Sequence, residues 1–113
     1  KKLGLQLMND DIFVNVVGGV KADEPALDLA IVSVIASSFF EKPVPDRTVV
    51  LGEIGLTGEV RAINRIEPRV HEAIKMGFER CFVPHDNLQN LKRADTMELI
   101  GINTVSQLVD LLF

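Results

Sequence analysis

The chain reads EPALDLAIVSVIASSFF from residue 24 to residue 40, and this stretch decides the fold. It is apolar on nearly every side of a helical wheel, with Asp28 as the only charge from residue 25 onward, which predicts a buried helix over 25–40. Asp23 is placed to cap this helix, and a proline in the first turn lacks only an amide that has no helical partner. Prolines at 43 and 45 prevent its continuation. Such a helix must pack between a sheet and other elements.

Strand and helix patterns surround this helix. Runs rich in β-branched and aromatic residues predict strands over 11–17, 48–54, 60–63, 80–83 and 97–102, with Gly55 and Gly58 joining two of them in a hairpin-like unit. An apolar stripe from Ile66 predicts a helix that Gly77 ends. Two further helices are expected, one over 86–91 capped by Asp86 and one after the capping box of residues 104–107. The order predicts an α/β (α+β) class, with a mixed sheet packed against helices.

Composition limits the function. The 113 residues are 47% hydrophobic and 25% charged, which suits one domain over 1–113 with its own core. The net charge of −4 gives no overall attraction to a phosphate backbone, so any DNA contact must be a local patch. No run of ~18 apolar residues predicts a membrane span. The lone Cys81 is expected to be a buried hydrophobe in a protein of the reducing cytoplasm.

Two segments with a fixed separation resemble the Lon family of Ser-Lys proteases. Residues 24–28, EPALD, stand where that family has Gly-Pro-Ser-Ala-Gly at the start of a long helix, and residues 51–61, LGEIGLTGEVR, resemble its Thr-Gly-Glu-Ile-Thr-Leu-Arg-Gly-Arg-Val. The stretch from residue 52, with RIEPR at 65–69 and GFERCFVP at 77–84, is similar to the carboxy-terminal Lon-like domain of the RadA (Sms) family of bacterial DNA repair proteins. This resemblance covers essentially the whole chain.

The Lon pattern also implies that the catalytic dyad is degenerate. It puts Ala26 in the place of the serine nucleophile and Glu67 in the place of the catalytic lysine. A Ser-Lys protease needs both a hydroxyl and a lysine neutral enough to act as a base. Ser33, Ser37 and Ser38 lie inside the long helix, where a serine usually bonds a preceding carbonyl. Residual Ser-Lys peptidase activity is therefore the outside alternative to a non-catalytic domain.

The basic residues Arg61, Arg65 and Arg69 are the candidate DNA-binding or intersubunit residues. Arg65 and Arg69 are four apart on the polar side of the predicted helix, and Arg61 lies on the strand before it, so their guanidinium groups could converge on phosphate. The competing interpretation pairs Arg65 with Glu67, Glu72 or an acid of a neighbouring subunit. No metal site is predicted, because His71 and His85 stand apart without ligand spacing and are expected to face solvent.

Membership of the RadA family implies more than these residues show. That family joins a zinc-binding segment and a RecA-like ATPase core to the Lon-like domain, which implies ATP, Mg and Zn for the full-length protein and no cofactor for this chain. It forms hexameric rings on DNA and promotes branch migration in recombination and repair, with a RecA-type recombinase as a further partner. Two compatible roles are expected for the domain: an assembly platform that pairs the basic face with acids such as Asp23, Glu24 and Asp28, or direct contact with DNA phosphates.

Overall fold

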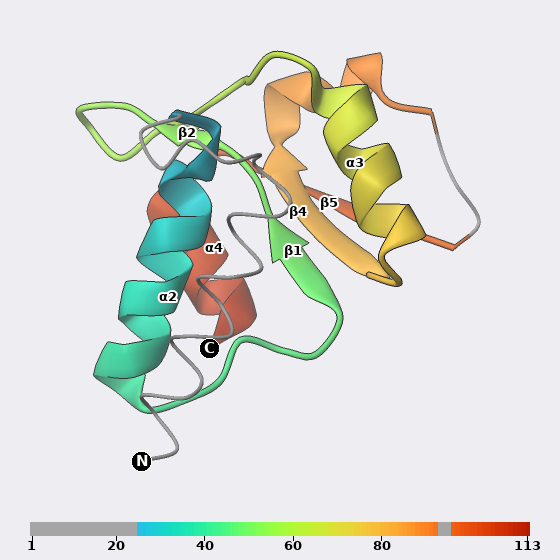
Figure 1. Cartoon of the computed structure of the whole chain (residues 1–113). Coiled ribbons are helices and arrows are strands. Elements are labelled where there is room, and N and C mark those ends of the chain that lie inside the picture. The colour runs from blue at the N-terminus through green and yellow to red at the C-terminus, as the bar shows by residue number, and fades with distance from the viewer. Residues whose placement is uncertain (1–24, 93–95) are drawn as a thin grey trace.

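The computed structural model of the protein describes residues 25–92 and 96–113 (Figure 1). The predicted strand over 11–17 and the proposed cap Asp23 lie outside these residues. The elements are two short 3-10 helices, three α-helices and five strands, in the order η1 (Pro25–Leu27), α2 (Asp28–Phe40), β1 (Thr48–Val50), β2 (Glu53–Ile54), β3 (Val60–Arg61), α3 (Ile66–Lys75), β4 (Arg80–Pro84), η2 (His85–Asn90), β5 (Glu98–Ile102) and α4 (Val105–Leu112). The predicted α/β class is confirmed.

The central sheet has three strands in the order β1-β4-β5, and both pairings are parallel. Cys81 in the middle strand lies opposite Val49 on one side and Leu99 on the other. The strands β2 and β3 form a separate antiparallel pair with Glu53 opposite Arg61. Parallel and antiparallel pairing therefore occur in two different sheets within the described part of the chain.

Helices cover both faces of the central sheet (Figure 1). Successive strand residues point to opposite faces, so Phe82 packs with α2 and α4 while its neighbours Cys81 and Val83 pack with α3. The α3 side contains Val49, Leu51, Ile63, Ile66, Val70, Ala73, Cys81, Val83 and Met97, together with Ala26. The other side contains Leu29, Val50, Val60, Phe82, Ile102, Leu108 and Leu112. We call the two coverings the α2/α4 layer and the α3/η2 layer.

The predicted strand over 48–54 is wrong as a single element, because the chain leaves the central sheet at Leu51 and Gly52. The Gly52 amide donates to the Ala26 carbonyl at 3.0 Å, and the Gly52 carbonyl accepts from the Leu29 amide at 3.1 Å. A Cβ at residue 52 would lie 2.4 Å from Leu29 Cδ1, so only glycine admits this approach. The backbone at residue 52 thus bonds to the start of the long helix instead of to another strand.

The long helix differs from its prediction in two respects. Its first three residues form the 3-10 turn η1, and the α-helix begins at Asp28, whose carboxylate accepts a hydrogen bond from the Ile54 amide at 3.0 Å. It is also not buried all round, since Ile35 is 62% exposed and Phe39 is 80% exposed. The buried residues on α2 are Leu29, Ala30, Ser33 and Ser37.

The other helices test the predicted caps. Gly77, with φ of 93°, ends α3, and the Phe78 amide reaches back to the Ala73 carbonyl at 3.1 Å, as predicted from the glycine. The capping box is confirmed, since the Gln107 amide donates to Thr104 Oγ1 at 3.1 Å. The prediction for Asp86 is wrong, because η2 is a 3-10 helix that starts at His85 and has no side-chain cap.

Candidate nucleic-acid and subunit interface

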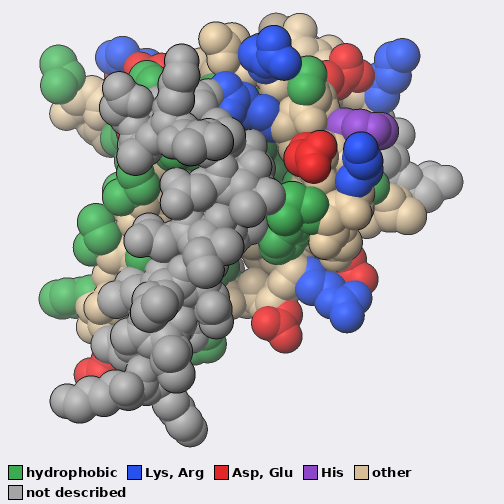
Figure 2. Space-filling view, viewed as in Figure 1, with side chains coloured by type: hydrophobic (Ala, Val, Ile, Leu, Met, Phe, Trp, Pro, Cys, Tyr) green, Lys and Arg blue, Asp and Glu red, His purple; other side chains and the backbone are tan. Residues whose placement is uncertain are grey.

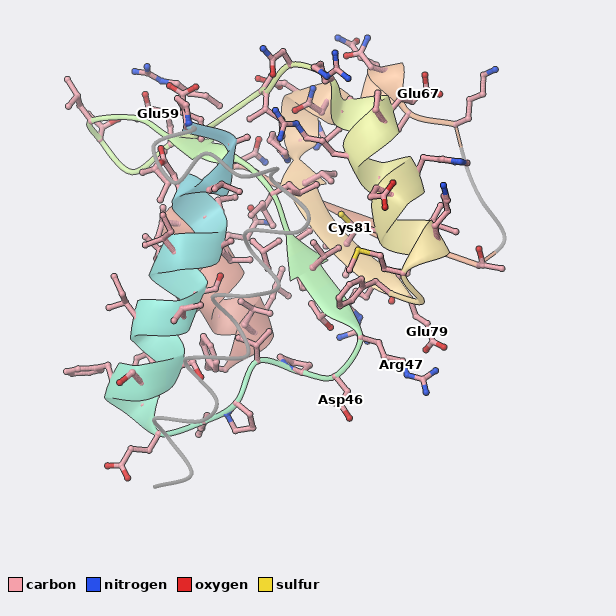
Figure 3. The ribbon with its side chains drawn as sticks, viewed as in Figure 1. Asp46, Arg47, Glu59, Glu67, Glu79 and Cys81 are labelled. Atoms are coloured by element: carbon pink, nitrogen blue, oxygen red, sulfur yellow. The ribbon has the colours of Figure 1, made fainter. Side chains whose placement is uncertain are left out.

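The two positions of the degenerate dyad have different environments. Ala26 is only 3% exposed and belongs to the core on the α3 side. Glu67 is exposed on the first turn of α3, where Figure 3 labels it. A side chain at residue 26 would therefore face packed apolar groups, and no hydroxyl stands there to attack a carbonyl.

The serines of α2 are engaged in local hydrogen bonds. Ser33 Oγ donates to the Leu29 carbonyl at 2.8 Å, which confirms the predicted bond to a preceding carbonyl. The same prediction is wrong for Ser37, whose hydroxyl donates to the carbonyl of Lys42, five residues further on. The Ser37 bond closes the end of the helix, where Glu41 adopts a left-handed conformation with φ of 53°.

Arg61 is held by acids of its own hairpin. Its guanidinium donates through Nε and Nη2 to Glu59 Oε2 at 3.2 and 3.0 Å, and Glu53 lies 3.9 Å away. The Glu59 carboxylate also accepts from the Thr57 amide at 3.0 Å and from the Thr57 hydroxyl. These hydrogen bonds, with that of the Thr57 hydroxyl the largest contributor, lower the pKa of Glu59 to about 2. Sequence reasoning identified Arg61 and missed the acid that neutralises it.

The hairpin tip is fixed from below and from the side. The Gly55 amide donates to the Glu59 carbonyl at 2.8 Å, and a Cβ at Gly55 would lie 2.0 Å from Glu59 Oε2, so the missing side chain leaves room for the carboxylate. The Val105 amide donates to the Gly58 carbonyl at 3.0 Å, which ties the turn to the start of α4. Leu56 stands at this tip and is 100% exposed.

Arg65 and Arg69 lie at the start of α3 and differ from each other. Arg65 is not on the polar side of the helix as predicted; it is the residue before the first turn, in a left-handed conformation with φ of 56°. Arg69 Nε donates to the Asn64 carbonyl at 3.1 Å and Nη2 donates to Asn64 Oδ1 at 3.2 Å. Within residues 25–92 and 96–113, the Arg65 side chain has no hydrogen bond or ion pair, so the proposed pairs with Glu67 or Glu72 do not form there.

Asn87 positions the segment that joins Arg61 to Arg65. It is 4% exposed, accepts a hydrogen bond from the Ile63 amide at 2.9 Å and donates one to the Ile63 carbonyl at 3.1 Å. This amide acts like a strand partner for a single residue. A buried asparagine 24 residues away in the chain gives no pattern in the sequence that could have revealed this role.

The remaining candidate groups are explained by the fold. Cys81 is fully buried, and burial raises the pKa of its thiol to about 12. His71 and His85 are exposed, as predicted. No three His, Cys, Asp or Glu side chains among the described residues are grouped to hold a metal ion. In the same part of the chain, no helix has the length and apolar character needed to cross a bilayer.

These features define a small α/β domain of protease-like sequence whose nucleophile position is a buried alanine and whose surface carries arginines. The chain belongs to the family described as subunit ChlI of Mg-chelatase, whose model matches residues 1–87. The predicted resemblance to RadA is confirmed over the whole length. The chain is 46% identical over 113 residues to the DNA repair protein RadA of Streptococcus pyogenes serotype M1, and 49% identical over 110 residues to that of Halalkalibacterium halodurans.

The extent of these matches is unequal on the two sides. The alignment with RadA of Streptococcus pneumoniae, at 42% identity, covers 100% of this chain and 27% of the relative. With the Streptococcus pyogenes protein the shares are 100% and 25%, and with the Halalkalibacterium halodurans protein 97% and 24%. The chain therefore spans about a quarter of the length of the curated relatives that it matches.

Proposed function

We propose that the chain is the non-catalytic Lon-like domain of a RadA-type DNA repair protein, in which it supports ring assembly and contacts DNA. The observation that carries the proposal is the whole-length similarity to proteins named DNA repair protein RadA, in a chain with a buried alanine at the nucleophile position. The full-length protein is then a DNA-dependent ATPase that processes recombination intermediates by branch migration, as a hexameric ring.

The chain's own residues do not fit the cofactors of such an ATPase. ATP with Mg would need a phosphate loop of the form G-x-x-x-x-G-K-[ST], and the sequence contains none. Zinc would need a group of Cys or His ligands, and the sequence has one cysteine, which is buried. We therefore place ATP, Mg and Zn in other parts of the full-length protein and derive no step through them here.

Arg65 is the best placed of the three arginines for a phosphate. The Arg61 guanidinium is balanced by Glu59, and the Arg69 guanidinium is bonded to Asn64. Arg65 is exposed at the start of α3, where the helix dipole also favours an anion. One such contact is weak alone, but a ring would present it repeatedly along one duplex.

The DNA role is tested by the salt dependence of binding. Fluorescence anisotropy with labelled duplex DNA should give an affinity that falls with salt, and Arg65→Ala should reduce the slope by about 0.9, the value for one phosphate contact on duplex DNA. Lys75→Ala, which removes an exposed charge from the other end of α3, is the matched control and should change the slope much less. Equal effects of the two variants would show that Arg65 has no specific contact.

The absence of catalysis is tested by restoring the hydroxyl. Ala26→Ser should cleave no unfolded casein, because the serine would lie in a buried apolar site and residue 67 supplies a carboxylate in place of a lysine base. Mass spectrometry of the reaction should find no new peptides for the natural chain or for the variant. New casein peptides from the natural chain would contradict the proposal directly.

The assembly role is tested by sedimentation velocity over a range of chain concentrations. The chain should form particles larger than a monomer at high concentration. The acidic surface first expected to pair with the basic one is reduced in the structure, because the Asp28 carboxylate is bonded to the Ile54 amide. A contact that depends on apolar groups is consequently the more probable basis for assembly, and it should persist in moderate salt.

A further inference from the structure

The least expected surface of the molecule is an apolar edge, which we define as Leu56, Ile31, Ile35 and Phe39. Ile31 is 41% exposed, and the other three are exposed to a greater extent. No charged residue occurs on α2 after Asp28. Figure 2 shows hydrophobic side chains along the side of the molecule that α2 and the hairpin form. Large apolar side chains gathered on one side commonly mark a protein contact.

Leu56 is the most protruding member of the apolar edge, and its support is stiff. Thr57 and Arg61 both bond the Glu59 carboxylate directly behind the tip, and α4 bonds the turn through the Gly58 carbonyl. A side chain on a preorganised turn loses little conformational freedom when it enters a partner, so more of its burial contributes to affinity.

A groove of about 490 Å³ lies on the other side of the sheet and could receive such a tip. We call it the α3 groove; it is lined by Glu67, Pro68, Val70, His71, Ile74, Leu91 and Lys92. Its apolar wall is formed by Val70, Ile74 and Leu91, and Lys92 brings a positive charge to meet the acids of a hairpin. A second groove of about 530 Å³ fits less well, because both of its charged residues, Glu79 and Glu98, are acids like Glu53 and Glu59.

The apolar edge and the α3 groove cannot meet within one chain. Figure 1 shows the hairpin loop beyond α2 at one end of the molecule and α3 at the other, with the central sheet between them. Two different surfaces on opposite sides of a subunit form a head-to-tail contact, which generates a closed ring or a filament when it is repeated. A second copy of this chain therefore offers the complementary surface that the first copy cannot use.

We propose that Leu56 and the apolar edge of one copy dock into the α3 groove of the next copy, with Leu56 as the anchor. This inference rests on the proposed assembly role and names the surfaces that perform it. The partner is a second copy of the chain, recognised by an apolar knob in an apolar groove with acids near Lys92. Contact of the hairpin tip with unstacked DNA bases is the other outcome that the experiment must separate.

The test uses pairs of cysteine variants of the chain, since Cys81 is buried and unreactive under mild oxidation. Leu56→Cys mixed with His71→Cys should form a disulfide-linked dimer, while each variant alone should stay largely unlinked. Leu56→Cys mixed with Asp46→Cys is the control, because Asp46 is exposed at a different part of the surface from the start of α3 (Figure 3). Linking of Leu56→Cys with itself, or equally with Asp46→Cys, would overturn the docking.

A second measurement separates this proposal from the assembly role itself. Leu56→Asp should weaken self-association at least about tenfold in sedimentation velocity, as the loss of an anchor residue does, and Leu56→Met should retain it. Association that is unchanged in Leu56→Asp refutes this docking and leaves the assembly role standing. A chain that stays monomeric at every concentration refutes both. Reduced binding of branched DNA by Leu56→Asp, with unchanged association, would assign the tip to nucleic acid and overturn the docking.

Discussion

The α3/η2 layer and the α2/α4 layer cover the same sheet with opposite arrangements of side chains. Helix α3 buries Ile66, Val70 and Ala73 and turns charged residues to solvent. Helix α2 buries two serines and exposes Ile35 and Phe39. The Ser33 and Ser37 hydroxyls are satisfied inside by carbonyls, so burying them costs little. The difference teaches that the outside of α3 is suited to water, whereas the outside of α2 is suited to another apolar surface.

The largest effect should come from placing the same charge on each helix. Val70→Asp puts an unpaired carboxylate at a site that is 5% exposed and should lower the free energy of unfolding by more than about 4 kcal/mol. Ile35→Asp, on the exposed side of α2, should change it by less than about 0.5 kcal/mol. Urea denaturation followed by circular dichroism measures both values.

Ile35→Asp also serves as its own control for the comparison. Self-association of this variant should fall while its stability is retained, because the substitution alters only the outer surface of α2. If Ile35→Asp instead unfolded the chain, the outside of α2 would be a core surface and the contrast between the two layers would be lost.

A smaller effect should come from the buried amide in the α3/η2 layer. Asn87→Ala removes both hydrogen bonds to Ile63 and leaves a buried amide and carbonyl without partners, which should cost about 2–3 kcal/mol in the free energy of unfolding. Asn90→Ala, at an exposed position of the same short helix, is the matched control and should cost less than about 0.5 kcal/mol. Similar losses in the two variants would mean that η2 tolerates the loss of its link to the arginine segment.

The smallest effect concerns the hairpin at the end of the apolar edge. The pKa of Glu59 is about 2 in the folded chain, below its ordinary value of 4.5. The stabilisation from its ionised form is therefore complete above pH 4.5 and is lost as the pH falls toward 2. Carbon NMR of the side-chain carboxyl should give a midpoint near pH 2 for Glu59.

Removing the hydroxyl that contributes most should move that midpoint. Thr57→Val should raise the pKa of Glu59 toward 4.5, whereas Thr96→Val, at a position far along the chain, should leave it unchanged. An unaltered midpoint in Thr57→Val would show that the hairpin tip is less firmly held than the structure indicates, and would weaken the case for Leu56 as a rigid anchor.

The sequence predicted those parts of the fold that depend on local signals. The stripe from Ile66, the stop at Gly77 and the capping box at Thr104 each involve neighbours within a few residues, and all are found as expected. The strand over 48–54 was predicted wrongly because its interruption depends on hydrogen bonds between Gly52 and a helix start more than 20 residues earlier. A helical wheel that is apolar all round likewise cannot say which side of α2 meets the sheet.

The candidate site was predictable in its residues and not in their states. The charges of Arg61 and Arg65 are visible in the sequence, but Arg61 is paired within its hairpin and Arg65 is displaced to the residue before the helix. Those outcomes depend on the turn that brings Glu59 beside Arg61 and on the backbone conformation at residue 65. Both are set by tertiary contacts, including the link from Asn87 to Ile63.

The position of β4 between β1 and β5 has a consequence for how the chain reaches its native state. Thr48 pairs with Arg80, 32 residues later, and Arg80 pairs with Glu98, so no strand of this sheet bonds to a neighbour in sequence. Loop closure must precede every one of these pairings, which makes folding slow compared with a hairpin-based sheet of similar size. The amides of Cys81 and Phe82 should exchange with solvent deuterium only when the whole domain opens, and their exchange rates would report its global opening.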